Sequence, residues 1–391
     1  MNYLERAQEL KDTLLEDRQT IHQFAETGFD LPKTSSYVAK KLREYGCQPQ
    51  QVGRCGVSCT VGHGGKTILL RADMDALPMA EESGLPFAAK NGHCHSCGHD
   101  IHTAMLLCAA KMLKERENEL KGTVKFMFQP AEELLSGAKD MIAAGILENP
   151  TVDAAVGMHI FSGLPFSRSG HILYHCGPVM NSGDTVRVRI TGLAAHGSMP
   201  FQGVDAINIA AHLTLALQEI ISREIPAQKE AVVLVGTISG GASPNTVAGE
   251  AELGVTLRAE SMELRNFLLK RVKEISEATA AVYRGSASVN VEVSVPPLYN
   301  EPELTKEIAG YAANLLPQGT VEEIPKLNGG EDFTYVAQKV PAAFLILGGG
   351  SIDEGYKYSQ HNPKIRFNET AFPAGAAMLA HCAEAWLEHN Q

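Results

Sequence analysis

The segment "NGHCHSCGHDIH", residues 91–102, concentrates side chains that bind metal ions. It contains four histidines, two cysteines and one aspartate. Imidazole nitrogens, thiolates and carboxylates are the usual protein ligands of zinc and other transition metals. Such a run is typical of a structural zinc site, of a redox-active Cys-x-x-Cys pair, or of one wall of a hydrolytic metal centre. The rest of the sequence has to distinguish these three possibilities.

Two of the three interpretations depend mainly on the cysteines. A structural zinc site needs four protein ligands, usually supplied by two separated pairs. Cys94 and Cys97 form one pair, and the other close pair is Cys55 and Cys59. A redox-active Cys-x-x-Cys would begin a helix beside an apolar strand. Neither interpretation explains the acidic and histidine residues that follow several of the expected strands.

Polar side chains recur where apolar, strand-like runs end. In open α/β sheets, ligands bind beyond the carboxyl ends of the strands. Taken singly, such a residue is more often a helix cap, a solvated charge or a hydrogen-bonded core histidine. Together with segment 91–102 they favour a two-metal hydrolytic site, in which a carboxylate not fully used as a ligand serves as general base. The residues follow "TILLRA", "VKFMFQPA", "AAVGM" and, one loop further on, "FLILGGG": Asp73, Asp75, Glu132, Glu133, His159 and His361.

Six motifs, in chain order, carry a resemblance to a known family: "RADMDALP", "HSCGHDIHTAMLL", "FQPAEE", "GMH", "GGEDF" and "HNPK". The chain resembles the bimetallic amidohydrolases that include hippurate hydrolase, N-acyl-amino-acid deacetylases and plant auxin-conjugate hydrolases, within the aminoacylase and glutamate carboxypeptidase superfamily. The resemblance covers almost the whole chain. It implies hydrolysis of the amide bond of N-acyl amino acids, such as N-acetyl or N-benzoyl conjugates. The alternative is a dipeptidase or carboxypeptidase that uses the same metals.

The same resemblance assigns roles to individual residues. It implies two divalent metal ions, and zinc, manganese, cobalt and nickel all suit these ligand types. Glu132 is implied as the general base and acid, Asp75 as the support of a metal ligand, and Asp100 as a residue that orients or caps the ligand segment. The neighbours His93, Cys94, His95 and His102 are not expected to bind metal. The implied metal ligands are Cys97, His99, Glu133, His159 and His361.

Three residues of the middle of the chain are implied to contact the substrate. His196, in "GLAAHGSMP", would stabilise the oxyanion from its own chain or from a partner subunit. Asn245 would lie near the substrate, unless it is an ordinary turn residue. Arg258 would pair with a substrate carboxylate, unless it is an ordinary strand arginine. This chain has Phe201 where many relatives have histidine, and "NTVAG" where they often have "NVIP", so the substrate preference is less defined than the reaction.

The elements that position these residues follow two patterns. Over residues 1–180 apolar strands alternate with helices, which predicts an α/β fold with a mixed, mostly parallel sheet and helices on both faces. From "GDTVRVRITG" onward the pattern becomes strand, helix, strand, strand, helix, strand, which predicts an inserted α+β, ferredoxin-like domain. After "PPLYNEP" the first pattern returns. We therefore expect a catalytic metal-binding domain at 1–180 and 297–391, with a lid and dimerisation domain at 181–296.

Composition limits the partners of the 391-residue chain. Its net charge of −11 argues against nucleic acid or an anionic membrane as a partner. The first residues do not resemble a signal peptide and no apolar run is long enough for a membrane span, so we expect a cytoplasmic location with its eight cysteines free or bound to metal. The resemblance implies a small-molecule substrate and a homodimer or higher homo-oligomer. A non-catalytic binding module with structural zinc is the alternative from another class.

Overall fold

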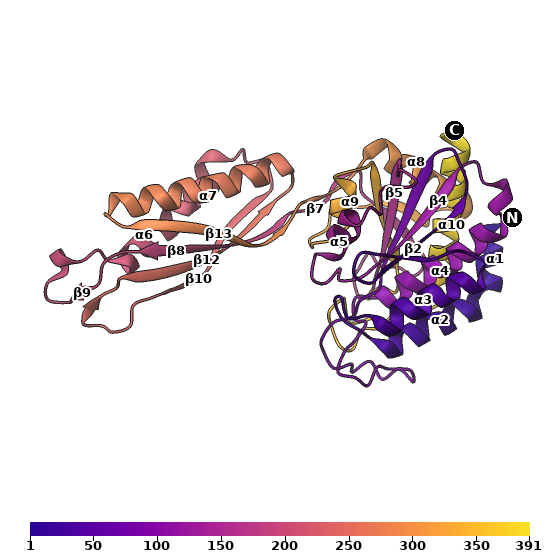
Figure 1. Cartoon of the computed structure of the whole chain (residues 1–391), viewed down its shortest axis with the longest axis horizontal. Helices are drawn as coiled ribbons and strands as arrows, with labels where there is room; N and C mark the ends of the chain where they lie inside the picture. Colours follow the sequence, from indigo (N-terminus) through magenta and orange to yellow (C-terminus); the bar gives the residue numbers. More distant parts are fainter. The chain divides into compact units, whose positions relative to one another are not determined.

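The computed structural model describes residues 1–391, which form two compact units (Figure 1). Unit 1 comprises Met1–Val179, Tyr299–Lys326 and Asp332–Gln391. Unit 2 comprises Met180–Leu298 and Leu327–Glu331. The catalytic and lid roles expected for the two parts of the chain remain predictions.

Unit 1 is built around an eight-stranded sheet with the order β1-β2-β4-β3-β5-β16-β6-β15. The pairs β4–β3, β3–β5, β5–β16 and β6–β15 are parallel, and the other three pairs are antiparallel. The expected mixed, mostly parallel sheet is therefore confirmed. A separate two-stranded sheet joins β7 (Gly177–Met180) to β14 (Leu298–Asn300). The strands of the main sheet are β1 (Gln50–Val52), β2 (Gly56–Gly62), β3 (Thr67–Asp73), β4 (Thr123–Gln129), β5 (Ala154–Phe161), β6 (Ile172–Tyr174), β15 (Val321–Glu323) and β16 (Ala342–Gly348).

Helices cover both faces of this sheet. Every residue of β3 is buried, as is usual for a strand that is covered on both sides. Ile68 and Leu70 of β3 join the main core with α4 and α10, whereas Arg71 faces the other side and lies 5.9 Å from the ring of Phe333, next to α9. The helices of unit 1 are α1 (Tyr3–Glu9), α2 (Lys11–Phe24), α3 (Pro32–Glu44), α4 (His99–Glu115), η1 (Glu117–Glu119), α5 (Gly137–Ala143), α8 (Pro302–Leu315), α9 (Thr334–Ala337) and α10 (Phe372–His389).

Unit 2 has the expected ferredoxin-like order of elements. Its four-stranded antiparallel sheet has the order β10-β12-β8-β13, and α6 and α7 share a core of their own with it. A small antiparallel pair, β9 with β11, lies outside this sheet. The elements are β8 (Gly183–Thr191), β9 (Ala195–His196), η2 (Pro200–Gln202), α6 (Ala206–Glu219), η3 (Ile220–Glu224), β10 (Ala231–Gly240), β11 (Thr246–Val247), β12 (Glu250–Ala259), α7 (Met262–Val282) and β13 (Ser286–Val295).

Two features of the fold bear on function. The strands β4, β3, β5 and β16 are consecutive parallel neighbours, so their carboxyl ends meet at one edge of the sheet. None of the helices combines the length and the apolar character that a membrane span requires.

Candidate metal centre

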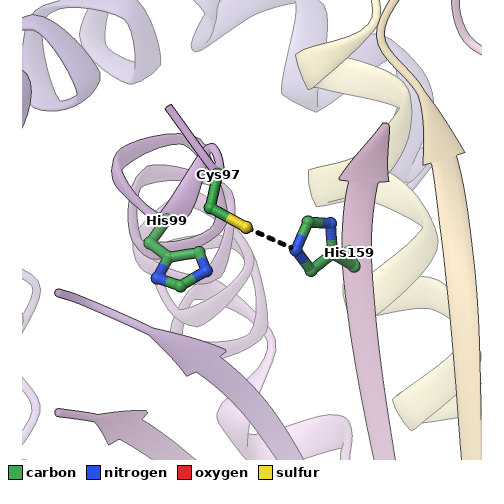
Figure 2. Close-up of side chains that lie close together, drawn as sticks. All are labelled: Cys97, His99 and His159. Carbon is green, nitrogen blue, oxygen red and sulfur yellow. Dashed lines mark hydrogen bonds between the residues drawn. The ribbon is translucent and has the colours of Figure 1, made fainter. Parts of the chain in front are cut away.

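The segments that follow the four parallel strands bring the predicted ligands of unit 1 together. Asp73 ends β3, His159 lies in β5, and Glu132 follows β4 by a short turn. Cys97 and His99 stand at the start of α4, and Cys97 Sγ lies 3.2 Å from His159 Nε2. Figure 2 shows these two side chains pointing toward each other, one from the α4 end and one from the strand.

The two glutamates and His361 complete the cluster. His361 Nε2 lies 3.3 Å from Glu133 Oε1, and His99 Nε2 lies 4.0 Å from a carboxylate oxygen of both Glu132 and Glu133. Three overlapping groups have all their ligand atoms within 4.8 Å of one another: Cys97–His99–His159, Cys97–Glu133–His361 and His99–Glu132–Glu133. The structure therefore brings together all five predicted ligands and the predicted base.

His99 provides the test of whether this cluster fits a metal ion. Its Nδ1 donates a hydrogen bond to the backbone oxygen of Asp75 at 2.8 Å, so the neutral ring carries its lone pair on Nε2. That Nε2 is buried and has no hydrogen-bond partner. An unpartnered buried polar atom costs about 1–3 kcal/mol. A nitrogen with a fixed lone pair, facing carboxylates and close to a thiol, fits a metal cation.

The charges around the cluster favour a cation there. Burial disfavours the charged ring, but the Asp73 carboxylate and Cys97 outweigh it and raise the pKa of His99 well above its usual value, so a metal ion takes the place of the proton that Nε2 gains without metal. Burial and the neighbouring His102 lower the pKa of His159 well below its usual value, so this ring is neutral and able to bind metal. Burial raises the pKa of the Cys97 thiol, so a metal ion has to displace a proton from this sulfur.

Asp75 supports the cluster through two kinds of atom. Its carboxylate accepts hydrogen bonds from the backbone N–H groups of Glu132 at 3.0 Å and Glu133 at 3.2 Å. Its backbone oxygen accepts the hydrogen bond from His99 described above, whereas its carboxylate lies 3.5 Å from the same nitrogen. Ala131, with φ of 53°, begins the tight turn that presents the two glutamates.

A second buried network was not anticipated from the sequence. Arg71 Nη1 donates to Asp73 Oδ2 at 2.7 Å, and His102 Nδ1 donates to Asp73 Oδ1 at 2.6 Å. His102 Nε2 accepts the backbone N–H of Ile160 at 2.8 Å, so both ring nitrogens are used and neither is left for a metal. Burial raises the pKa of the Asp73 carboxyl, but the nearby Arg71 outweighs burial and holds this pKa well below its usual value. Arg71 and Asp73 are two positions apart in "RAD", so both side chains lie on the same face of the strand. This spacing could have predicted their contact.

The cysteines give no support to a structural zinc site. None of the clusters of metal-ligand side chains joins Cys55 or Cys59 to Cys94 and Cys97. The Cys55 thiol instead donates to the backbone oxygen of Phe29 at 3.3 Å. Cys94 is buried, and its backbone exchanges hydrogen bonds with Leu77.

Unit 2 brings two of its three predicted substrate contacts together. His196 in β9 pairs with Thr246 in β11, and the N–H of Gly197 donates to the backbone oxygen of Asn245 at 2.7 Å. Arg258 lies near the opposite end of the main sheet, eight positions along β12 from Glu250, or about 26 Å at the usual rise per residue. Its Nη1 donates to the backbone oxygen of Leu257 at 3.0 Å.

Comparison with known proteins gives several full-length matches. IAA-amino acid hydrolase ILR1-like 2 of Arabidopsis thaliana is 36% identical, over 98% of this chain and 88% of its own length. N-acetyl-L-cysteine deacetylase of Bacillus subtilis (strain 168) is 33% identical over 98% and 90%. Thermostable carboxypeptidase 1 of Saccharolobus solfataricus is 33% identical over 95% and 94%.

A solved structure and a family model agree with these relatives. The YXEP protein of Bacillus subtilis, described as a dinuclear metal binding peptidase from the M20 family, has a TM-score of 0.84 and 30% identity, covering 97% of this chain and 99% of that one. The model of peptidase family M20/M25/M40 matches residues 69–385, which include every residue of the cluster at the carboxyl edge of the sheet. The chain therefore belongs to peptidase family M20/M25/M40.

Proposed function

We propose that this protein is a metal-dependent amidohydrolase that cleaves the amide bond of N-acyl amino acids with small acyl groups, such as acetyl or benzoyl. One observation carries the proposal: a thiol, three imidazoles and the carboxylate of Glu133 converge beside the buried carboxylate of Glu132. Two relatives support the substrate class, because they are named for hydrolysis of IAA-amino acids and for deacetylation of N-acetyl-L-cysteine.

The residues that would hold two divalent ions are Cys97, His99, Glu133, His159 and His361. Zinc, manganese, cobalt and nickel all suit this mixture of sulfur, nitrogen and oxygen ligands. When bound, such ions polarise a carbonyl and lower the pKa of a water molecule toward neutrality.

Glu132 would move the proton. Its backbone is fixed by Asp75, and its carboxylate faces His99 from within the cluster. The oxygen of water bonds to the carbonyl carbon while its proton passes to Glu132. The carbon–nitrogen bond then breaks, and Glu132 returns the proton to the leaving nitrogen. The products are a carboxylic acid and a free amino acid.

His196 would stabilise the negative charge that develops on the carbonyl oxygen. Its Nδ1 accepts the backbone N–H of Ser198 at 3.2 Å, so the neutral ring carries its proton on Nε2, which is a hydrogen-bond donor. Loss of one such donor typically costs about 3 kcal/mol of transition-state stabilisation.

The position of His196 within unit 2 supports a contribution from a second copy of the chain. Unit 2 begins at Met180, and β8 runs from Gly183 to Thr191, at the end of the unit that carries β9, about 26 Å further on. We therefore propose a homodimer, or a higher homo-oligomer, in which this end of unit 2 supplies His196 and Asn245 to a partner's substrate. Arg258, at the other end, would pair with the substrate carboxylate. The cytoplasmic location stays a prediction.

The second candidate is a dipeptidase or carboxypeptidase that uses the same cluster. It is favoured by the match to thermostable carboxypeptidase 1. Both reactions break an amide bond, so the residues of the metal centre do not distinguish them.

A substrate panel separates the two candidates. The metal-stripped protein is reloaded with Zn²⁺, Mn²⁺, Co²⁺ or Ni²⁺ singly and tested on N-acetyl amino acids, N-benzoyl amino acids and dipeptides. We expect the largest kcat/KM on an N-acyl amino acid. A larger kcat/KM on dipeptides would establish the second candidate, and no hydrolysis with any of the four metals would contradict both.

A further inference from the structure

A cluster of buried charged side chains adjoins the segment that carries Cys97 and His99. Arg18 and His22 come from α2, Asp100 comes from the first turn of α4, and Glu81 comes from the segment between β3 and α4. The exposed fractions of their side chains are 2% for Arg18, 4% for His22, 0% for Asp100 and 1% for Glu81. Charged side chains at this degree of burial are rare unless they are paired.

The four side chains are paired with one another. Arg18 Nε donates to Asp100 Oδ2 at 2.8 Å, and His22 Nδ1 donates to the same oxygen at 2.8 Å. His22 Nε2 lies 3.0 Å from both carboxylate oxygens of Glu81. Because each nitrogen of His22 faces a carboxylate, the ring satisfies both partners when both nitrogens carry protons. Two positive and two negative groups then face one another, and Arg18 Nη1 also pairs with the partly exposed Glu369 at 3.0 Å.

The segment that this cluster holds has little regular structure of its own. Between β3 and α4 the chain runs from Met74 to Gly98 without a helix or strand. Long segments of this kind are usually functional. Leu77 and Cys94 exchange backbone hydrogen bonds of 3.0 Å, which close the segment into a loop.

The loop is attached to the end of α2. Asn91 Nδ2 donates to the backbone oxygen of Phe24 at 2.8 Å, and His93 Nδ1 donates to that of Ala25 at 2.9 Å. Glu81 also accepts the backbone N–H of Ala89 at 2.8 Å, which ties the start of the loop to its middle. Hydrogen bonds therefore hold the loop against the carboxyl end of α2.

We infer that Arg18 and His22 are positioning residues for the metal ligands Cys97 and His99. His22 connects Glu81, which precedes the two ligands, with Asp100, which directly follows His99, and Arg18 donates to the same oxygen of Asp100 as His22 does. The chain that carries the two ligands is thus fixed to α2 before Cys97, at Glu81, and after His99, at Asp100. This inference rests on the proposed function, because it assumes that Cys97 and His99 bind a metal ion.

The inference differs from a purely structural role in what it predicts. A buried ion cluster that only stabilises the fold would lower the stability of the protein when it is disrupted, but it would leave the metal affinity of the folded fraction unchanged. A positioning role predicts weaker metal binding by folded protein. Loss of residues that orient metal ligands typically lowers metal affinity about 10- to 100-fold.

Co²⁺ binding to the metal-stripped protein tests the inference. Co²⁺ bound to a thiolate absorbs in the near ultraviolet, so the titration reports both affinity and the contact with Cys97. In His22→Gln, a single amide replaces two N–H donors on opposite sides of a ring. We expect the Co²⁺ dissociation constant of folded His22→Gln to rise about 10- to 100-fold, with a shifted or weakened thiolate band.

Asp184→Asn is the matched control. Asp184 is a carboxylate of unit 2 with an exposed fraction of 0%, and it pairs with Arg265 at 2.8 Å. Thermal unfolding of the metal-free proteins measures the stability lost in each variant. We expect Asp184→Asn to lose stability while it keeps the Co²⁺ affinity and the thiolate band of the wild type.

A second variant covers the case in which His22→Gln does not fold. Glu81→Gln keeps the shape of the side chain and one oxygen that can accept the Ala89 N–H, and we expect it to weaken Co²⁺ binding in the same direction. Wild-type Co²⁺ affinity and an unchanged band in folded His22→Gln or Glu81→Gln would overturn the inference. Absence of a thiolate band in the wild type would instead overturn the proposed metal ligation, and the inference with it.

Discussion

At the scale of single residues, the metal centre is organised by hydrogen bonds that fix one state of each side chain. His99 and His159 each donate from Nδ1 to a backbone oxygen, that of Asp75 at 2.8 Å and that of Ile160 at 2.7 Å. Both rings therefore present Nε2 to the cluster. Asp75 also fixes the backbone of Glu132 and Glu133, so the turn that carries them does not depend on their own side chains.

The role of Glu132 is tested by Glu132→Gln. The amide keeps the size of the side chain but cannot take a proton from water, so we expect turnover to fall by about 10²- to 10⁴-fold. Metal content should stay at the wild-type value because Glu132 is not among the proposed ligands. Metal analysis and steady-state kinetics measure both quantities. Glu303→Gln, at an exposed position of α8, is the control and should keep full activity.

Retention of wild-type turnover in Glu132→Gln would exclude Glu132 as the general base. Loss of one metal ion in the same variant would show that it is a ligand instead.

At the scale of elements, α4 starts where the fold leaves no room for an ordinary residue. Gly98, directly before His99, has φ of 93°. A Cβ at this position would lie 2.6 Å from Ile160 Cγ2 and 3.2 Å from Phe367 Cζ. A left-handed backbone and close packing thus set the direction in which His99 leaves the loop.

Gly98→Ala tests this constraint against a matched glycine in the same loop. Gly92 also has a positive φ, 84°, but a Cβ there would have no atom within 4 Å. We expect Gly92→Ala to cost about 1 kcal/mol of the free energy of unfolding, from backbone strain alone. Gly98→Ala should cost more and should also weaken Co²⁺ binding. Denaturant unfolding and Co²⁺ titration measure the two effects, and equal behaviour of the two variants would contradict the argument.

The contact between α2 and α4 should make stability depend on pH. Although burial opposes ionisation of His22, Asp100 and then Glu81 raise its pKa above the usual 6.5. The other groups that face the ring are Arg18 and His95. His95 is buried, and its burial lowers its own pKa to about 3. A raised pKa in the folded state stabilises fully below the unfolded value of about 6.5, and this contribution is lost as the pH rises through the raised value.

The stability lost in metal-free His22→Gln should therefore be largest below pH 6.5 and should shrink at higher pH. Denaturant unfolding of wild type and variant at pH values below and above 6.5 measures the difference in the free energy of unfolding. A difference that stays constant with pH would show that folding does not raise the pKa of His22.

At the scale of the whole molecule, the chain forms two units with separate cores. The core of unit 1 includes residues of β3, β4, β5 and β16 together with α4 and α10, and that of unit 2 combines β8, β10 and β12 with α6 and α7. The metal cluster made by Cys97, His99, Glu133, His159 and His361 lies within unit 1. Proteins with two such units commonly unfold in more than one step.

Chelation should therefore act on one unit. We expect calorimetry to resolve two transitions and metal removal to lower the Tm of one of them, because a ligand that binds only the folded state stabilises by about 2.7 kcal/mol at 100 times its Kd. The other transition should not move. Complete unfolding of the chain on chelation would favour structural zinc in a non-catalytic binding module.

The sequence alone determined the elements of this protein and the types of residue at the carboxyl edge of its main sheet. The alternation in "GDTVRVRITG" and the fully apolar "TILLRA" identified a half-exposed strand and a buried one, and the structure has β8 and β3 there. Such patterns are local, because a strand or helix exposes its faces with a fixed period. The motifs also indicated the family correctly.

Only the tertiary structure decided which distant residues meet. Asp100 pairs with Arg18 and His22, which lie 82 and 78 positions away, and no local pattern marks such partners. Within unit 2, the register of β9 and β11 brings His196 beside Asn245, whereas the length of β12 separates Arg258 from both. The physical reason is that hydrophobic period fixes each element by itself, while the packing of elements fixes which side chains share a buried space.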